Sequence, residues 1–337
     1  MLNKTFKIGE RSVGGGESPY IIAEAGSNFN QSLDTARRLI DVAANAGADA
    51  VKFQLFRADV LYPNGGQVYE IFKSVQLDAD WLPAMKVHAE EQGIHFSASA
   101  FDPYSIRTLL ELEVPFMKVA SSETTNLDLV ARMAAANVPI FLSTGMCGIT
   151  EISEALDVCT SIGLSDISLM QCQAHYPLEA KDVNLAAMDT MRSLFGGPVG
   201  FSDHTLGIST AIAAVGRGAE TLEKHFTLDR KMEGPDHFYA LEPDELKSMV
   251  QSVRQVHEAI GNGEKKITEA EKEVGRRNGI WLSKDVCAGE LITETSIEIR
   301  RPAVGVKDRH LNAVSGTKAK HDLVSGSPLR WEDVDFS

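Results

Sequence analysis

Apolar and polar positions follow two alternating rhythms along residues 20–260. Short apolar runs, typical of buried strands, take turns with longer stretches whose apolar residues recur every three or four positions, as on one face of a helix. The first such pair is "YIIAEAG" (20–26) and "LDTARRLIDVAANAGA" (33–48), in which Leu39, Ile40 and Ala43 fall on one side. This alternation predicts parallel strands joined by helices.

The same rhythm predicts eight strands in all. Eight strand–helix units over roughly 240 residues close into a (β/α)₈ TIM barrel more readily than they form an open sheet. An open doubly wound sheet is the alternative, but no glycine-rich dinucleotide-binding fingerprint follows the first strand. The other predicted strands are 49–56, 94–100, 115–121, 139–145, 167–173, 198–204 and 220–226, and the other predicted helices lie near 79–92, 103–112, 126–136, 150–162, 184–194, 208–217 and 243–260.

The two ends of the chain differ from this central pattern. "TFKIGERSVG" (5–14) predicts a short N-terminal hairpin that turns at Gly9 and Glu10. Residues 263–278 are charged and almost free of large apolar side chains, which indicates a linker. Short apolar runs with glycine turns follow, so we expect a barrel domain over 1–262 and a small β-rich domain over 279–337.

The charge of the chain limits its partners. With 33 Lys and Arg against 47 Asp and Glu, the formal net charge is −14, which argues against nucleic acid. The four cysteines form no C-x-x-C pair, so we expect free thiols in a reducing cytoplasm. No apolar stretch approaches the ~20 residues of a membrane span, and the N-terminus lacks an apolar signal core. We therefore expect a cytoplasmic protein with no membrane partner.

Polar side chains stand at the ends of nearly all predicted strands. In a TIM barrel the carboxyl ends of the strands and the loops after them carry the active site. One lysine in an apolar strand can pair with a carboxylate or reach solvent, but two lysines and several serines on one rim indicate a site for a phosphorylated or carboxylated small molecule. The candidates are Glu24, Lys52, Gln54, Ser99, Lys118, Ser121, Glu123, Ser143, Tyr176, Ser202, Asp203, Glu223 and Lys224.

Two histidines occupy matching places in neighbouring units. His204 in "FSDHT" and His225 in "LEKHF" are 225 − 204 = 21 residues apart, which is one strand–helix repeat. Two imidazoles at the tops of adjacent strands can share one divalent metal, although either could instead be a hydrogen-bonded core histidine. The turn in "GPDH" (234–237) is expected to place Asp236 and His237 over the rim, while the remaining histidines are expected to be structural or on the surface.

Seven motifs, in order along the chain, resemble the sialic acid synthase family. The end of the chain, with "VCAGELIT" (286–293) and "IRRPAVG" (299–305), resembles the antifreeze-like (SAF) domain of that family. The resemblance implies a TIM barrel followed by a SAF domain. The seven barrel motifs are "IIAEAGSN" (21–28), "ADAVKFQ" (48–54), "FMKVASSE" (116–123), "LSTGM" (142–146), "FSDHT" (201–205), "LEKHF" (222–226) and "GPDH" (234–237).

The resemblance also implies a reaction. Family members condense phosphoenolpyruvate with an open-chain N-acylated amino sugar, such as N-acetylmannosamine or a 2,4-diacetamido-6-deoxyhexose, to give a nine-carbon 2-keto acid and phosphate. They are metal-dependent transferases that use manganese or magnesium, which His204 and His225 would hold in this chain. They form homodimers in which each SAF domain caps the partner's barrel.

The resemblance assigns roles to the other candidates as well. Glu24 matches a carboxylate that steers protons or water, and Glu123 is a second candidate for that role. Asp236 and Tyr176 would contact sugar hydroxyls, and Arg301 matches an arginine that reaches the partner's barrel and binds the N-acyl region. The residues implied to hold phosphoenolpyruvate are Lys52, Lys118, Ser121, Ser143 and Ser202.

Two departures from the family pattern leave the sugar open. Phe29 stands where the family often has histidine, and Ala174 stands where neuraminate synthases often have asparagine, while "VKFQLF" (51–56) is closer to the legionaminic branch. Two other functions remain as alternatives. One is a pyruvate aldolase that uses Lys52 or Lys118 as a Schiff base, and the other is a non-catalytic sugar-binding or coat-assembly protein on the same fold.

Overall fold

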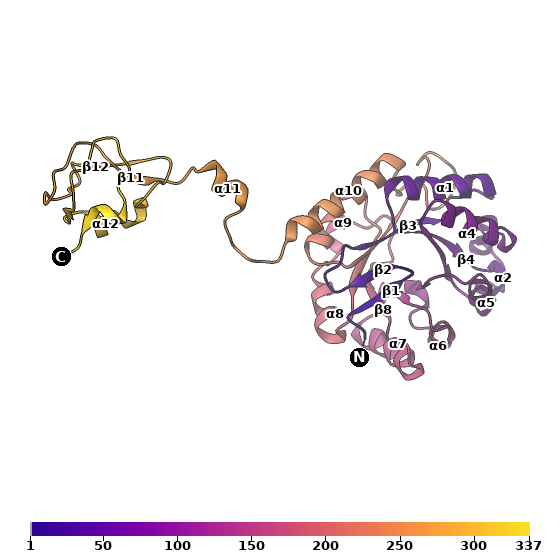
Figure 1. Cartoon of the computed structure of the whole chain (residues 1–337). Helices are drawn as coiled ribbons and strands as arrows, with labels where there is room; N and C mark the ends of the chain where they lie inside the picture. The colour runs from indigo at the N-terminus through magenta and orange to yellow at the C-terminus, as the bar shows by residue number, and fades with distance from the viewer. Residues whose placement is uncertain (1) are drawn as a thin grey trace. The chain divides into compact units, whose positions relative to one another are not determined.

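The chain forms two compact units, and the boundary between them in the sequence lies between Gly261 and Asn262. A closed barrel of eight parallel strands forms the centre of the first unit. The computed structural model describes residues 2–337. Strand β10 pairs with β3 and closes the ring, which confirms the predicted TIM barrel (Figure 1). The barrel strands are β3 (Tyr20–Gly26), β4 (Ala50–Leu55), β5 (His95–Ala100), β6 (Met117–Val119), β7 (Ile140–Ser143), β8 (Ile167–Gln171), β9 (Val199–Asp203) and β10 (Thr221–His225).

Helices surround the ring of strands, and α1 (Leu33–Ala46) shows how the sequence specifies them. Ser32 caps its N-terminus by accepting a hydrogen bond from the amide of Thr35, and Gly47 ends it with φ of 85°, which suits glycine. Between these ends, Leu39 and Ile40 turn toward the strands. The other barrel helices are α4 (Leu82–Glu91), α5 (Pro103–Glu111), α6 (Leu127–Ala134), α7 (Ile149–Ile162), α8 (Ala187–Phe195), α9 (Ser209–Gly216) and α10 (Pro243–Ile260).

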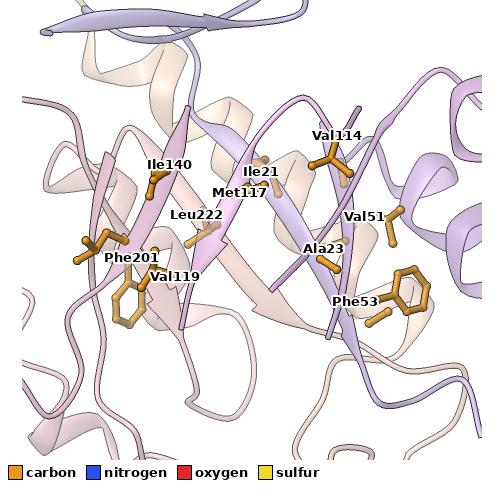
Figure 2. Packing of buried hydrophobic residues seen from close by; sticks show 14 of the residues in the cluster. Ile21, Ala23, Val51, Phe53, Val114, Met117, Val119, Ile140, Phe201 and Leu222 are labelled. Atoms are coloured by element: carbon orange, nitrogen blue, oxygen red, sulfur yellow. The ribbon is translucent and has the colours of Figure 1, made fainter. Parts of the chain in front are cut away.

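The strands separate two apolar cores because successive side chains point to opposite faces. Alternate residues, such as Ile21, Val51 and Leu222, belong to the large core shared with the helices (Figure 2). The other face lines the interior, and a second apolar cluster fills its N-terminal end beside the hairpin of β1 (Thr5–Ile8) and β2 (Arg11–Gly14). This hairpin was predicted. The interior cluster consists of Phe6, Ile8, Val13, Tyr20, Ile22, Ala50, Phe116, Phe141 and Met170.

An insert between β4 and α4 contains two helices that the sequence did not predict. They are α2 (Ala58–Leu61) and α3 (Gln67–Ser74). Val68, Ile71 and Phe72 of α3 recur at helical spacing, but the helix has only eight residues and none of them is buried, so its apolar stripe covers only two turns.

The second unit has its own small core and antiparallel pairs. Strand β11 (Gly279–Leu282) pairs with β12 (Ile297–Arg300), and β13 (Lys318–Ala319) pairs with β14 (Val334–Asp335). Its elements also include the short helices α11 (Glu269–Val274) and α12 (Leu311–Val314), the first of which falls in the predicted linker. The expected small β-rich domain is confirmed. Within residues 2–337, no helix has the length and apolar character needed to cross a bilayer.

Candidate active site

A cavity of about 530 Å³ opens at the carboxyl ends of the barrel strands. Its walls come from strand ends and from the loops after them, as the fold requires. The structure therefore brings together residues that are spread over more than 200 positions of the sequence. The predicted site residues that line it are Glu24, Lys52, Gln54, Ser99, Lys118, Ser121, Ser143, Tyr176, Ser202, His204, His225 and Asp236.

Two buried lysines form the floor of this cavity. The Nζ atom of Lys52 donates to Ser99 Oγ at 2.8 Å and lies 2.6 Å from Glu24 Oε2. The Nζ atom of Lys118 donates to Ser143 Oγ at 2.6 Å. Each ammonium group is thus held by a hydroxyl from the neighbouring strand, since β4 pairs with β5 and β6 pairs with β7. Point charges beside hydroxyl donors are the groups that bind phosphate and carboxylate.

Glu223 is a site residue that the sequence placed at a strand end but to which it assigned no role. Its Oε2 lies 3.8 Å from Lys52 Nζ and its Oε1 lies 3.5 Å from Lys118 Nζ, so one carboxylate serves both lysines. Although burial opposes ionisation, Lys118 and Lys52 lower the pKa of Glu223 to about 2. Its position two residues before His225 was the available signal, because residues two apart on a strand share a face.

The pKa of Glu24 is raised, whereas that of Glu223 is lowered. Burial, reinforced by the charge of Glu223, raises the pKa of Glu24 to about 7 even though Lys52 is close. The neighbouring Gln54 donates from Nε2 to Glu24 Oε1 at 3.3 Å. A carboxyl group with a pKa near neutrality can both give and take a proton under ordinary conditions, as general acids and bases do.

The two imidazoles of His204 and His225 face each other, with ring centroids 5.6 Å apart. The Nδ1 atom of His204 lies 2.8 Å from the carbonyl oxygen of Gln173, so Nδ1 donates to that oxygen and Nε2 is the nitrogen left for another partner. Burial lowers the pKa of His225 to about 4, so its ring is neutral at neutral pH. Imidazole nitrogens are suitable ligands for a divalent metal.

A metal held by His204 and His225 would need further ligands besides these two imidazoles. Within residues 2–337, no group of three or more His, Cys, Asp or Glu side chains could hold a metal ion. A pair of imidazoles is compatible with an ion that takes its remaining ligands from water or substrate oxygens, as catalytic sites with open positions do. The two imidazoles could therefore supply two ligands to the metal that the family resemblance implies.

Asp236 and Tyr176 lie on the wall beside the imidazoles. The ring of Tyr176 is 4.0 Å from that of His204, measured between centroids. Asp236 accepts from Tyr239 Oη at 2.8 Å and from Ser27 Oγ at 2.9 Å, so its carboxylate is held in place. Tyr239, which also lines the cavity, was not predicted.

The prediction that His237 projects over the rim is wrong. Its Nδ1 lies 2.6 Å from Thr227 Oγ1 and its Nε2 lies 2.7 Å from Asn30 Oδ1, and the side chain is fully buried. It ties the loop after β10 to the loop after β3 and does not line the cavity.

Asp203 and Lys224 are also not part of the cavity. The Nζ atom of Lys224 donates to Asp203 Oδ2 at 2.8 Å, and both side chains are buried. They alternate with Ser202 and Glu223, so the pleat sends them to the other face of the barrel wall. The expectation that they reach the rim is wrong for that reason.

Two further candidates lie outside the cavity lining. Glu123 ends a 3₁₀ turn (Ser121–Glu123), where it is half-buried and its Oε2 accepts a long hydrogen bond of 3.4 Å from Asn126 Nδ2. Arg301 belongs to the second unit, where it is exposed and donates from Nε to Asn278 Oδ1 at 3.1 Å. The structure therefore favours Glu24 over Glu123 as the catalytic carboxylate.

A closed barrel with a charged floor, paired imidazoles and an appended β-rich domain defines an enzyme of the sialic acid synthase type. The chain belongs to the NeuB family, which matches residues 39–265, and the SAF domain matches residues 277–335.

Individual relatives agree with this assignment. The chain is 37% identical over 336 residues to the N,N'-diacetyllegionaminic acid synthase of Legionella pneumophila, with 94% of each chain covered. It is 38% identical over 304 residues to the Campylobacter jejuni protein of the same name, which covers 85% of this chain and 91% of that one. The crystal structure of N-acetylneuraminic acid synthetase from Leptospira borgpetersenii matches with a TM-score of 0.77 at 31% identity, covering 81% of this chain and 95% of that one.

Proposed function

We propose that the protein condenses phosphoenolpyruvate with the open-chain form of an N-acylated amino sugar. Water is consumed, and the products are a nine-carbon 2-keto acid and inorganic phosphate. The observation that carries the proposal is the placement of the lysine pair Lys52 and Lys118 next to the imidazole pair His204 and His225 in one cavity. The two lysines would bind the anionic groups of the enol phosphate. A metal on the two imidazoles would polarise the aldehyde next to it.

Phosphoenolpyruvate would occupy the floor. Its phosphate and carboxylate would take hydrogen bonds from Lys52 and Lys118, with help from the hydroxyls of Ser121, Ser143 and Ser202. These donors are already fixed by their neighbours, so little conformational entropy is lost on binding. Glu223 would keep both lysines charged despite their burial, because its own pKa is about 2.

The imidazoles of His204 and His225 would hold a divalent metal, manganese or magnesium. Such an ion supplies Lewis-acid polarisation of a carbonyl oxygen when it is bound. Around that position, Asp236 and Tyr176 would bind hydroxyls of the sugar and orient its aldehyde toward the floor. The sugar and the enol phosphate are then held side by side, which removes the entropic cost of their meeting.

The reaction balances without a further co-reactant. The C3 carbon of phosphoenolpyruvate bonds to the aldehyde carbon, whose oxygen gains a proton, and C2 becomes cationic. Water adds to C2 and loses one proton. The C2–oxygen bond to phosphate then breaks, the departing phosphate takes up the second proton of that water, and the 2-keto group forms. Glu24 would exchange these protons, because its pKa of about 7 allows both directions near neutral pH.

The second unit would complete the site in a homodimer. In this proposal the SAF domain caps the barrel of a partner subunit, and Arg301 binds the N-acyl region of the sugar there. Arg301 is exposed in its own unit, so its guanidinium is available for such a contact.

A Schiff-base aldolase remains the enzymatic alternative, because burial lowers the pKa of Lys118 and a neutral amine is what that chemistry needs. The experiment is to incubate the full chain with phosphoenolpyruvate, Mn²⁺ and a panel of N-acyl sugars, and to measure phosphate release and product mass. We expect release that depends on the sugar and stops with chelator. Borohydride trapping of pyruvate on a lysine, without phosphate release, would establish the aldolase. Sugar binding with no turnover would establish the non-catalytic alternative.

A further inference from the structure

A buried ion pair lies directly behind the paired imidazoles. Asp203 precedes His204 at the end of β9, and Lys224 precedes His225 at the end of β10. The two strands are neighbours, and their register sets Lys224 opposite Asp203, with Lys224 Nζ 2.8 Å from Asp203 Oδ2. Because successive side chains point to opposite faces, the ion pair lies on the helix side of the barrel wall, whose cavity side carries the imidazoles.

The ion pair also holds the backbone on both sides of His204. Asp203 Oδ1 accepts from the amide and from the hydroxyl of Thr205, each at 2.8 Å. Lys224 Nζ donates to the carbonyl oxygen of Thr205 as well as to Asp203. Thr210 Oγ1 adds a further hydrogen bond to Asp203 Oδ2 at 2.9 Å. The segment that carries His204 is thus tied, from outside the cavity, to the strand that carries the second imidazole.

Packing alone does not explain a charged pair at this place. Toward the amino end of the same face, β9 and β10 bury Phe201 and Leu222 in the large apolar core (Figure 2). The side chains of Lys224 and Asp203 are at most 1% exposed, and a pair of charges buried this deeply is often no more stabilising than well-packed apolar residues. Departures from the pattern that packing favours are expected at functional sites. This departure falls on the two strands that carry the imidazoles.

The hydrogen bonds of the two rings orient each imidazole separately. His204 Nδ1 donates to Gln173, which follows β8, and His225 Nδ1 lies 3.5 Å from the hydroxyl of Tyr239, in the loop between β10 and α10. Neither contact joins β9 to β10. The backbone pairing of these two strands ends at the residues of the ion pair. The side-chain contacts of the pair therefore extend the connection between the strands to the level of the imidazoles.

We infer that Asp203 and Lys224 are positioning residues, which hold His204 and His225 at the separation at which both imidazoles bind one divalent ion. The inference rests on the proposed function, because it concerns the metal proposed there. The ion pair contacts neither substrate nor metal and acts through the backbone on both sides of His204. Groups that bind one ion must be held within about 0.5 Å of their productive geometry, so looser strand ends weaken metal binding.

The test measures Mn²⁺ binding to the full chain without substrate, from the electron paramagnetic resonance signal of free Mn²⁺. The variant combines Asp203→Leu with Lys224→Met, because an apolar pair of similar volume usually preserves stability, whereas a single substitution leaves an unpaired buried charge. We expect a melting temperature within about 4 °C of wild type. The dissociation constant for Mn²⁺ should rise at least about tenfold, since changes to groups that orient metal ligands commonly cost 10–100-fold in affinity.

Arg254→Met is the matched control, because it removes an ion pair at the opposite end of the barrel. There Arg254 Nη2 lies 2.7 Å from Asp49 Oδ2, and both side chains are partly buried. Distant sites act independently, so the dissociation constant for Mn²⁺ should stay within about twofold of the wild-type value even if the melting temperature falls. Equal weakening of Mn²⁺ binding in this control and in the double variant would show that general loosening of the barrel is the cause, and would overturn the inference.

The other outcomes separate the inference from the proposed function. An unchanged dissociation constant in the double variant would overturn the inference while the metal site itself stands. If circular dichroism shows that the double variant does not fold, Thr205→Val takes its place. This variant removes one hydrogen bond to Asp203 and should raise the dissociation constant about threefold, and wild-type affinity would again overturn the inference. Mn²⁺ binding to the wild type that is no tighter than to His204→Ala with His225→Ala would refute the proposed metal site, and the inference with it.

Discussion

The two ends of the barrel interior use the same strands for opposite purposes. At the N-terminal end, Tyr20 and Phe141 join a closed apolar cluster next to the hairpin. Four residues further along β3 stands Glu24, and two residues further along β7 stands Ser143, both on the cavity wall. Residues two or four positions apart on a strand share a face. The inward face of these strands therefore carries packed apolar side chains at the N-terminal end and site residues at the carboxyl end.

The two ends differ in how costly their side chains are to bury. The upper layer buries Glu24, Lys52, Lys118 and Glu223 together, and buried charges are expensive unless they are paired. Within that layer, Glu24 Oε2 is paired with the Lys52 ammonium 2.6 Å away, whereas Glu223 Oε2 lies 3.8 Å from the same ammonium and has no hydrogen-bond partner. The lower layer is apolar and aromatic, with Phe116 and Phe141 rings 5.0 Å apart in an edge-to-face contact. Stability and reactivity are thus concentrated at opposite ends.

The largest expected effect is at the upper end. The double variant His204→Ala and His225→Ala should lower kcat by about ten-thousandfold, because Lewis-acid catalysis is worth several kcal/mol. The melting temperature of the double variant should stay close to that of the wild type. His88→Ala is the control, since His88 pairs with Asp41 on the outer helices and should retain full turnover. A fully active double variant would eliminate the proposed metal site.

The next effect contrasts two residues of one strand. Phe141→Ala should lower the free energy of unfolding by about 3–4 kcal/mol, because it opens a cavity among Tyr20, Phe116 and Phe6. Its kcat should stay near the wild-type value at a temperature where it is folded. Denaturant titration and steady-state kinetics measure the two quantities.

The partner variant is Ser143→Ala, two residues further along β7. It removes the hydroxyl that accepts from Lys118, so the KM for phosphoenolpyruvate should rise while the free energy of unfolding falls by about 1 kcal/mol, less than in Phe141→Ala, because Glu223 still faces the ammonium. If the two variants affect stability and KM alike, the division between the ends of the barrel does not hold.

A smaller effect concerns the pH dependence of stability. Glu24 has a folded pKa of about 7 against an ordinary 4.5, so its favourable contribution is complete below pH 4.5 and is lost as the pH rises through 7. Glu24→Gln should remove this loss. Relative to wild type, the variant should gain about 2 kcal/mol between pH 5 and pH 8 in metal-free urea titrations. Glu223, with a pKa of about 2, titrates below this window. Parallel pH profiles would mean that Glu24 ionises normally.

The smallest expected effect tests the second unit against the barrel. Arg301→Ala should raise the KM for the sugar about tenfold and the KM for phosphoenolpyruvate less than about twofold, because one charged hydrogen bond is lost outside the floor. Arg330→Ala, in the same unit, is a control of equal charge. Equal changes in both KM values would remove Arg301 from the proposed sugar site.

Much of the fold could be predicted because each strand and each helix carries its own local signal. The run "YIIAEAG" became β3, and the capped, periodic stretch after it became α1, with ends within two residues of those expected. Helix α3 was missed although Val68, Ile71 and Phe72 recur at helical spacing, because it has only eight residues. A periodic pattern is recognised over a window of about 11–18 residues, which is longer than this helix.

The candidate site could be predicted only in part, for a related reason. Lys52 and His225 stood out because ionisable residues are unusual in apolar strands. Glu223 and Lys224 were both placed at the rim and neither was given a role, because the direction of each side chain was not considered. Glu123 could not be judged at all, since it follows β6 in a turn that has no periodicity.

The sequence by itself determined the order of strands and helices, the family, and which strand ends carry ionisable groups, because these depend on neighbours a few positions apart. Only the tertiary structure decided that Glu223 lies between two lysines, that Glu24 has a pKa near 7, and that Lys224 pairs with Asp203 away from the cavity. Those properties depend on distances between strands far apart in the chain and on burial, and closure of the barrel creates both.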